Sequence, residues 1–462
     1  AAALVVPALL YFALRAWALS ASPAIPPTDD FLTNPFHGAT LAERLATVML
    51  TWWKYLGLIL FPHPLTTDYY PAMIPVIGWS DVRAWLGLGA FAAAAVYGAV
   101  FMRQRSVPAF GILFFLITFS VVSNAVVNLG TPMNDRFLFM PLAGACVVIA
   151  WLFAQCADRL RSSGYARVAQ TCMVLVFCAY AARTFSRNAD WKDDLTLFTH
   201  DVQVSDKSAR CQVMTGKLCY ERGSKEADPA LKQQFLDKAR THLERGLVIY
   251  DRYALAWGLL GAIEMESKNW RKSGELFVEC LKCEPAEPVA LKNLFFVARR
   301  MREAKDIDGA ESAFRSLLLF DKTNAEVYLQ LADLLMRNGK AGQAIPVLDS
   351  ALVHRPDLAD TYRLKGEVQA VYLNEPQNAE ENFLKALELD PRNVGVLDNL
   401  GVAAFKKGDF PRALDYFLRA TGSDTTNADA LSHAAKAYEA LGRKEEAVAY
   451  AARAQQAARK AR

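Results

Sequence analysis

Charged residues are scarce in the first 186 residues of this 462-residue chain. That segment holds 11 Lys and Arg and 7 Asp and Glu, whereas residues 187–462 hold 41 charges of each sign. A single globular domain does not divide its charge in this way. The net charge of +4 belongs to the charge-poor segment, so the sequence does not indicate a basic surface for nucleic acid, and no nucleic-acid partner is predicted.

Familiar catalytic and metal-binding signatures are also lacking. The sequence has no HExxH, P-loop, GxSxG or dinucleotide-binding motif. Its six His residues are scattered, so neither a clustered metal site nor a cofactor held by the chain is predicted. Cys280 and Cys283 form a CxxC, but i, i+3 spacing within a predicted helix strains a disulfide, which favours a structural role.

The first segment, residues 1–186, contains long runs of residues without a charge. A hydrocarbon core needs about 20 apolar residues in a helix. Residues 41–61 contain three charges and either cross the membrane or lie in its interface. Together with that stretch, the uncharged runs predict a polytopic membrane region of five or six spans over residues 1–186. The five uncharged runs are 1–14, 84–102, 106–134, 137–156 and 168–182.

The basic residues at the ends of these runs predict an orientation. Arg103 and Arg105 lie in one short loop, and Arg159 to Arg167 lie in another. Cytoplasmic loops are enriched in Lys and Arg, so both loops are predicted to be cytoplasmic. Loop 62–83, turn 129–136 and everything after residue 187 then lie on the other side, in a bacterial periplasm or an endoplasmic-reticulum lumen.

The second part of the chain has an internal period of 34 to 37 residues. In many units a further small residue precedes the repeated one by twelve positions, and this pattern is that of the tetratricopeptide repeat (TPR), a helix–turn–helix unit. The small residues let the two helices approach closely, and a Leu or aromatic residue four positions later fills the space between repeats. The repeated residues are Ala239, Ser273, Ala310, Ala344, Ala379, Ala413 and Ala447, and the preceding ones are Gly261, Ala332, Gly401 and Ala435, with Gly216 and Gly366 at stretched spacings.

The sequence therefore predicts an all-α chain in which a transmembrane helical bundle is followed by a TPR α-solenoid. A linker is expected at 187–205, and about seven repeats at 206–462, with residues 224–236 inserted in the first. Solenoids of this kind form a concave groove that holds a peptide or protein. The alternatives are a spacer or a dimerisation surface.

Two predicted outer loops carry candidate site residues. Arg136, in the turn before a span, can bind a lipid phosphate, because guanidinium matches phosphate oxygens and neutralises their charge. The alternative is an ordinary interfacial Arg paired with Asp135. Asp68 is either a polar loop tip or a substrate contact.

The order of several short segments resembles that of the transmembrane-and-TPR protein O-mannosyltransferases and their bacterial relatives, a family of the GT-C glycosyltransferase class. The segments are Asn34-Pro35, Tyr55 to Pro62, Asp68-Tyr69, Asp135 to Pro141 and Arg187 to Trp191. The resemblance implies transfer of a sugar from a polyprenyl- or dolichyl-phosphate donor to protein Ser or Thr hydroxyls. It places Arg136 and Asp135 at the donor phosphate and assigns acceptor binding to the repeats. The implied outer-loop substrate contacts are Asn34, His63, Asp68 and Tyr69.

The chain departs from that family at the expected position of the catalytic base. Such enzymes carry a carboxylate in the first outer loop, where it activates the acceptor hydroxyl. This sequence is expected to be N-terminally truncated and to begin after that loop, so the chain would be inactive while its intact parent is an enzyme. Asp29 and Asp30 are the remaining catalytic candidates.

Two other functions remain open from the sequence. The first is a non-enzymatic, membrane-anchored TPR scaffold that assembles envelope or secretory proteins. The second is an O-antigen-ligase-like protein, because some of those also carry TPR tails. The ligase predicts a large outer loop rich in Arg and His, which this sequence does not show.

Overall fold

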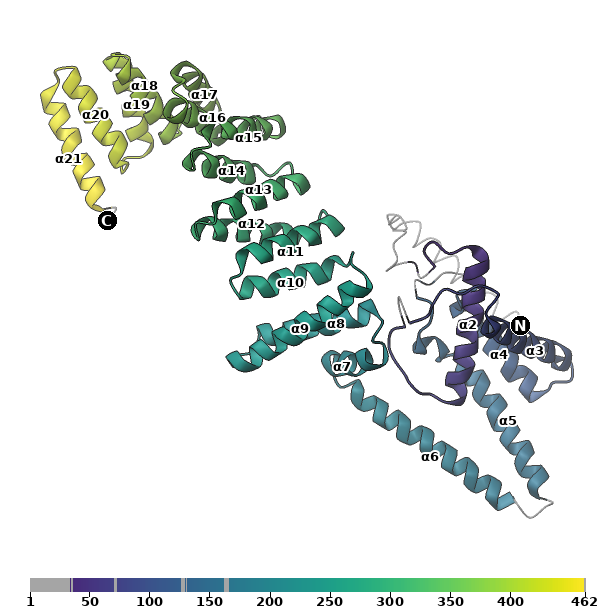
Figure 1. Cartoon of the computed structure of the whole chain (residues 1–462). Coiled ribbons are helices and arrows are strands. Elements are labelled where there is room, and N and C mark those ends of the chain that lie inside the picture. Colours follow the sequence, from purple (N-terminus) through teal and green to yellow (C-terminus); the bar gives the residue numbers. More distant parts are fainter. Residues whose placement is uncertain are drawn as a thin grey trace. The chain divides into compact units, whose positions relative to one another are not determined.

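The computed structural model describes residues 34, 36–69, 73–125, 129, 131–161 and 166–460. Within these residues the chain is helical and contains no strand, which confirms the predicted fold class. Contacts divide the chain into two compact units, Ala1–Ala256 and Trp257–Arg462, and each is described here by itself (Figure 1). The boundaries predicted at residues 186 and 205 from charge and repeats stay a prediction.

The first unit begins with apolar helices. Of the described helices, α3 and the part of α5 up to Arg159 are long and apolar enough to cross a membrane, and α4 is a shorter apolar helix. The predicted run 1–14 lies outside the described residues, and runs 41–61 and 168–182 fall in α2 and α6. The elements are α2 (Leu41–Leu60), α3 (Val82–Met102), α4 (Val107–Val122), the 3-10 helix η1 (Asp135–Leu138), α5 (Pro141–Arg161) and α6 (Ala166–Asp190).

The uncharged run 106–134 forms a shorter helix than its length suggests. α4 ends at Val122, and Asn124 adopts a left-handed conformation with φ 58°. The amide Nδ2 of Asn124 donates to the carbonyls of Thr131 (2.8 Å) and Pro132 (3.2 Å). Asn tolerates this conformation and bonds backbone groups, so it organises the following loop and ends the helix.

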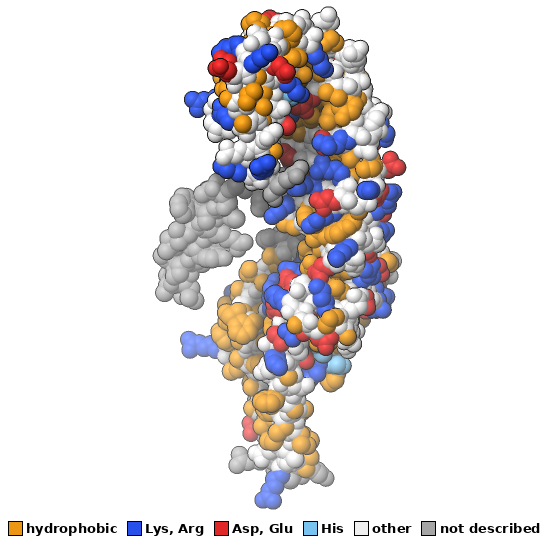
Figure 2. Space-filling model, turned by 90° about the vertical axis from the view of Figure 1, so that its left-hand side faces the viewer, with side chains coloured by type: hydrophobic (Ala, Val, Ile, Leu, Met, Phe, Trp, Pro, Cys, Tyr) orange, Lys and Arg blue, Asp and Glu red, His pale blue; other side chains and the backbone are white. Residues whose placement is uncertain are grey.

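Glycines and aromatic rings pack the apolar helices together. A Cβ on Gly111 of α4 would lie 2.7 Å from the carbonyl oxygen of Gly144 in α5, so only glycine permits this close approach. A buried aromatic cluster fills the space between α2, α3 and α4. Its members are Tyr55, Phe91, Phe115 and Phe119. The exposed surface is also apolar, and Phe177 and Phe185 of α6 are among its exposed residues. Figure 2 shows many hydrophobic side chains towards the lower end of the view.

Three helices complete the first unit, and a fourth crosses its boundary. Residues 187–205, predicted as a linker, form the end of α6 and helix α7. The insertion 224–236 mostly lengthens α9, which starts after the N-cap Asp228. The helices are α7 (Asp194–Val204), α8 (Ala209–Ser224), α9 (Pro229–Ile249) and, across the boundary, α10 (Ala254–Glu266).

The repeats appear as helix pairs. From α8 to α21 the chain forms seven such pairs, which is the predicted number of repeats. Cys280 and Cys283 both lie in α11 as free thiols. The helices of the second unit are α11 (Trp270–Cys283), α12 (Pro288–Glu303), α13 (Ile307–Phe320), α14 (Ala325–Arg337), α15 (Ala341–His354), α16 (Ala359–Glu367), α17 (Pro376–Leu389), α18 (Val394–Lys406), α19 (Phe410–Ser423), α20 (Ala428–Ala440) and α21 (Lys444–Lys460).

Small residues lie where the two helices of a pair approach each other. A Cβ on Gly366 would come within 2.6 Å of the ring of Phe383, and one on Gly261 within 2.9 Å of Phe277. The packing residues predicted from the period are buried, except for Ala447 in the last helix, which is half-buried. The buried ones are Gly216, Ala239, Gly261, Ala344, Gly366, Ala379, Gly401 and Ala413.

One irregular helix explains a stretched spacing. Gly366 precedes Ala379 by thirteen positions, one more than the twelve of the regularly spaced units. The π-helix η2 (Val368–Tyr372) follows α16 directly. A π-turn holds one more residue than an α-turn, so it accommodates the extra residue without turning the small residue away from Phe383.

Candidate functional site

The loop that follows α2 is bonded to α7 and to the start of α8. Oγ1 of Thr66 and Oγ of Ser205 share a hydrogen bond of 2.7 Å, and both hydroxyls are buried. The amide N–H of Thr67 donates to Oδ2 of Asp201 (2.7 Å). The Ser208 hydroxyl donates to Oδ2 of Asp68 at 3.0 Å. Residues 66–68 are therefore fixed to the first helices after the apolar bundle.

A buried ion pair lies behind this contact. Arg187 is 7% exposed, Asp201 is 0% exposed, and Nη1 of Arg187 is 2.8 Å from Oδ1 of Asp201. Nη1 also lies 3.1 Å from Oδ2 of Asp190. Burial alone would raise the pKa of Asp201, but hydrogen bonds from Arg187 and Thr67 outweigh it and hold that pKa below its usual value. The carboxylate therefore stays charged and links α6, α7 and loop 61–69.

Asp135 bonds the same loop from the other side. The Tyr69 hydroxyl donates to Oδ1 of Asp135 (2.7 Å), and the Thr66 N–H donates to Oδ2 (3.0 Å). Next to it, the side chain of Asn134 donates to the carbonyl of Thr67 (2.9 Å). In the described structure Asp135 forms no ion pair with Arg136. The carboxyl of Asp135 thus positions the outer loop.

The titration of Asp135 gives a first prediction. Burial raises its pKa to about 6 in the folded chain, against about 3.9 in an unfolded one. Between these values the folded state binds more protons, so stability falls as the pH rises through this window. Asp135→Asn keeps an acceptor for Thr66 and has no charge. We expect its stability relative to wild type to improve by about 1–2 kcal/mol between pH 4.5 and pH 7. Thermal unfolding at both values checks this, and a constant difference would contradict it.

Two arginines at this end of the bundle are available to a ligand. Arg136 is exposed, with its guanidinium 5.9 Å from the ring centroid of Phe137. Nη2 of Arg183, near the end of α6, lies 2.9 Å from Nδ1 of His63. Nε of Arg183 is buried and has no hydrogen-bond partner among the described residues. A buried unpaired donor of this kind is uncommon and is satisfied if an anion or a water binds beside it.

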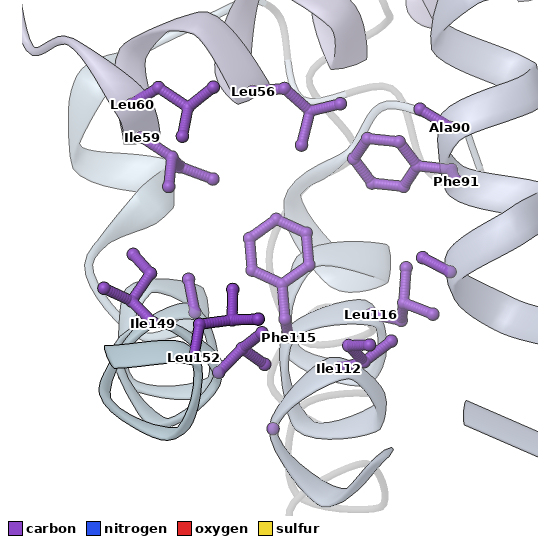
Figure 3. Close-up of a pocket in the computed structure, with 14 residues that line it drawn as sticks. Leu56, Ile59, Leu60, Ala90, Phe91, Ile112, Phe115, Leu116, Ile149 and Leu152 are labelled. Carbon is purple, nitrogen blue, oxygen red and sulfur yellow. The ribbon is translucent and has the colours of Figure 1, made fainter. Parts of the chain in front are cut away.

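An apolar cavity of about 270 Å³ lies between α2, α3, α4 and α5. In Figure 3, side chains from these helices surround it, with Ile59 and Leu60 opposite Phe115 and Ile149. The Tyr180 hydroxyl donates to the carbonyl of Leu60 (2.6 Å), so α6 covers the point where α2 ends. Leu60 therefore links the cavity lining to α6, on which Arg183 lies three residues after Tyr180. The full lining is Leu56, Ile59, Leu60, Ala90, Phe91, Ala94, Gly111, Ile112, Phe115, Leu116, Ala145, Val148, Ile149 and Leu152.

The structure brings together some of the residues suggested by the sequence. Asp68, Tyr69 and Asp135 take part in the bonded loop, whereas His63 and Arg136 are exposed at the same end of the bundle. Asn34 accepts a hydrogen bond from the Phe36 N–H (3.1 Å) and belongs to a separate turn. Asp29 and Asp30 lie outside the described residues. No cluster of His, Cys, Asp and Glu able to hold a metal occurs in the part of the chain that the structure covers.

Several polar residues of this site could not be recognised from a sequence motif. Thr66, Ser205 and Asp201 lie in segments with no motif, so only their burial identifies them. Arg183 had a signal, because it is the one charge that follows the uncharged run 168–182 before Arg187. A single charge within a long apolar helix often marks a functional position.

Comparisons with known proteins agree with the repeats. Family models described as tetratricopeptide repeats match residues 301–367, 369–428 and 399–462. The chain in the crystal structure of MamA is 25% identical in sequence. The alignment covers 35% of this chain and 95% of the MamA chain, with a TM-score of 0.32. The PilF structure from Pseudomonas aeruginosa is 20% identical and covers 43% of this chain and 89% of its own, with a TM-score of 0.34.

Curated relatives extend the similarity beyond the repeats. Human protein O-mannosyl-transferase TMTC3 is 22% identical over 383 residues, which are 78% of this chain and 36% of that protein. Protein O-mannosyl-transferase Tmtc3 of Drosophila melanogaster is 26% identical over 201 residues, 42% of this chain and 21% of that protein. The chain is thus a TPR protein similar to the TMTC proteins, and it spans about a third of the length of the first of them.

Proposed function

We propose that the chain is the C-terminal portion of a membrane glycosyltransferase, which moves a sugar from a polyprenyl-phosphate carrier to Ser and Thr hydroxyls of proteins. The observation that carries the proposal is the apolar cavity between α2, α3, α4 and α5, together with Arg183 and the exposed Arg136 at one end of these helices. The name shared by the relatives, protein O-mannosyl-transferase, supports mannose as the sugar and protein as the acceptor.

The cavity suits the hydrocarbon part of such a carrier. All fourteen lining residues are apolar, so burying a branched hydrocarbon there gains dispersion contacts and leaves no polar group of the lining unsatisfied. The helices α3 and α5, which can cross a membrane, form two of its walls. A lipid can therefore place its chain between these helices while its head stays at their ends.

The ends of these helices suit the phosphate. α2 ends at Leu60, α5 begins at Pro141 and α6 passes Arg183, so His63, Arg136 and Arg183 lie at one end of the bundle. Guanidinium groups bind phosphate oxygens in pairs, and the unpaired Nε of Arg183 offers such a donor. A carrier with its phosphate at the arginines and its hydrocarbon between α2, α4 and α5 satisfies both regions at once.

The acceptor side follows from the bonded loop. If α2 to α6 span a membrane, the contacts of Thr66 and Thr67 with α7 place loop 61–69 and the first repeat on the same side of it. We assign that side to the periplasm or the lumen from the positions of the basic residues. Protein acceptors held by the repeats then meet the sugar on the side where its phosphate is bound.

Binding of the lipid tests the proposal. We expect Arg136→Ala and Arg183→Ala each to weaken the affinity of the purified chain in nanodiscs for a fluorescent polyprenyl phosphate about tenfold. That factor corresponds to about 1.4 kcal/mol, close to the lower end of the contribution of one hydrogen bond to a charged group. The matched control is Arg103→Ala, an exposed residue at the opposite end of α3, which should leave the affinity unchanged.

A second variant tests the cavity. Ala145→Phe adds a ring to the lining and should weaken binding of the polyprenyl phosphate and of the uncharged polyprenol alike. The arginine variants should affect only the phosphate. Unchanged lipid affinity in all three variants would leave the membrane-anchored scaffold as the better function.

A further inference from the structure

A small cleft opens between two neighbouring repeats of the second unit. It lies between α18 and α20 and has a volume of about 190 Å³. Its apolar floor is made by Val402, Phe405 and Phe417, and Phe417 is itself buried between the helices. The remaining lining residues are Lys406, His433 and Lys436, so no acidic side chain faces the cleft. We name this set of six residues the α18–α20 cleft.

The two lysines of the cleft differ from most of their neighbours. Lys406 and Lys436 are exposed, and among the described residues neither has an acidic partner within ion-pair distance. Nearby lysines are paired: Lys385 lies 2.9 Å from Glu381, and Lys407 is paired with Glu380. The lysines of the cleft therefore keep their charge available.

The cleft residue His433 is hydrogen-bonded to an acidic side chain, Asp398. Nδ1 of His433 lies 2.8 Å from Oδ1 and 3.1 Å from Oδ2 of Asp398. The His433 ring also packs on Phe417, with centroids 5.4 Å apart. His433 is thus held against the floor by Phe417 and is hydrogen-bonded to the Asp398 carboxylate. The cleft combines an apolar floor with two uncompensated positive charges.

We propose that the α18–α20 cleft binds an acidic segment of a partner protein, with one apolar side chain on the floor and a carboxylate between Lys406 and Lys436. The inference rests on the proposed function only in so far as that function assigns protein binding to the repeats. Charge complementarity selects the carboxylate, because two ammonium groups without an acidic partner attract an anion to the cleft. The small volume selects a single anchoring side chain in place of a folded surface.

A matched pair of peptides tests this in the full chain. The probes are a fluorescent heptapeptide that alternates Leu with Asp and a counterpart that alternates Leu with Asn. We expect the acidic peptide to bind at least tenfold more tightly and to lose affinity as the NaCl concentration rises. The double substitution Lys406→Ala and Lys436→Ala should remove that preference. Lys407→Ala, which changes an adjacent but paired lysine, should retain it.

The outcomes separate this inference from the proposed function. Equal binding of the two peptides, no detectable binding of the acidic one, or an unchanged preference in the double variant would each overturn it. Tighter binding of a single-stranded RNA of the same charge would do so as well. Because the cleft variants leave α2 to α6 intact, polyprenyl-phosphate affinity should be unchanged in them. Loss of lipid binding with retained peptide binding would count against the proposed function alone.

Discussion

Asp201→Ala should lower the free energy of unfolding of the first unit by about 3–5 kcal/mol, because it leaves the buried guanidinium of Arg187 without its main partner. The same change removes the acceptor of the Thr67 N–H, so loop 61–69 loses one attachment. We expect the thermal unfolding transition of the first unit, followed by circular dichroism, to move down by about 10 °C.

A nearby carboxylate provides the control for Asp201. Asp194 lies in the first turn of α7 and is exposed, so Asp194→Ala should change stability by less than about 0.5 kcal/mol. Replacing both partners by apolar residues, Arg187→Met with Asp201→Leu, should recover part of the loss, because no unpaired charge then remains buried. If the two single Asp variants unfold at the same temperature, the ion pair does not hold α6 and α7 together.

The repeats could be predicted because their packing is local in sequence. The two residues that meet within a pair, such as Gly401 and Phe417, are separated by one helix and one turn, and the same separation recurs in Gly261 and Phe277. A period therefore shows both the helices and their contact. Even the irregular spacing before Ala379 was visible, although only the structure shows that a π-turn accommodates it.

The bonded outer loop could not be predicted in the same way. Thr66 and Ser205 are 139 positions apart, and no periodic pattern connects them. The sequence also suggested that Asp135 could pair with its neighbour Arg136. In the structure the Asp135 carboxyl accepts from Tyr69 and Thr66, and the Arg136 side chain lies over Phe137. Adjacent residues on a 3-10 turn face different directions, so sequence proximity did not identify the partner.

Membrane spans were predicted less accurately than repeats. Absence of charge identified α3 and α5, which contain most of the uncharged runs 84–102 and 137–156. It did not show where α4 ends, because Asn124 carries no charge and yet ends the helix through hydrogen bonds to its own loop. Hydropathy thus locates apolar stretches of the chain. It does not locate the ends of helices, because these depend on single polar side chains.

Gly401→Ala should lower the free energy of unfolding of the second unit by about 1–3 kcal/mol. A Cβ at this position would clash with Cε1 and Cδ1 of the Phe417 ring. Phe417 is buried and packs against α20. Either α18 must shift from α19 or the ring must leave its rotamer, and both disturb the packing of the repeat.

Gly395 of the same helix provides a matched control. A Cβ there would make only ordinary contacts, at 3.6 Å from Arg363 and Asn393. Gly395→Ala should therefore stabilise the helix by about 0.5–1 kcal/mol, since alanine loses less backbone entropy than glycine. Urea unfolding of the full chain, followed by circular dichroism, compares the two variants. The two substitutions add the same methyl group to the same helix, so opposite signs isolate the contact with Phe417.

Making room beside residue 401 should reduce the loss of stability caused by Gly401→Ala. Phe417→Leu alone should destabilise the second unit, because it leaves space beside Gly401. Combined with Gly401→Ala, it should cost less than the sum of the two single changes, since the new methyl occupies part of the space that the ring vacates. Strict additivity would show that Gly401 and Phe417 do not constrain each other. The close approach of the paired helices, which the 34-residue period predicts, would then need another cause.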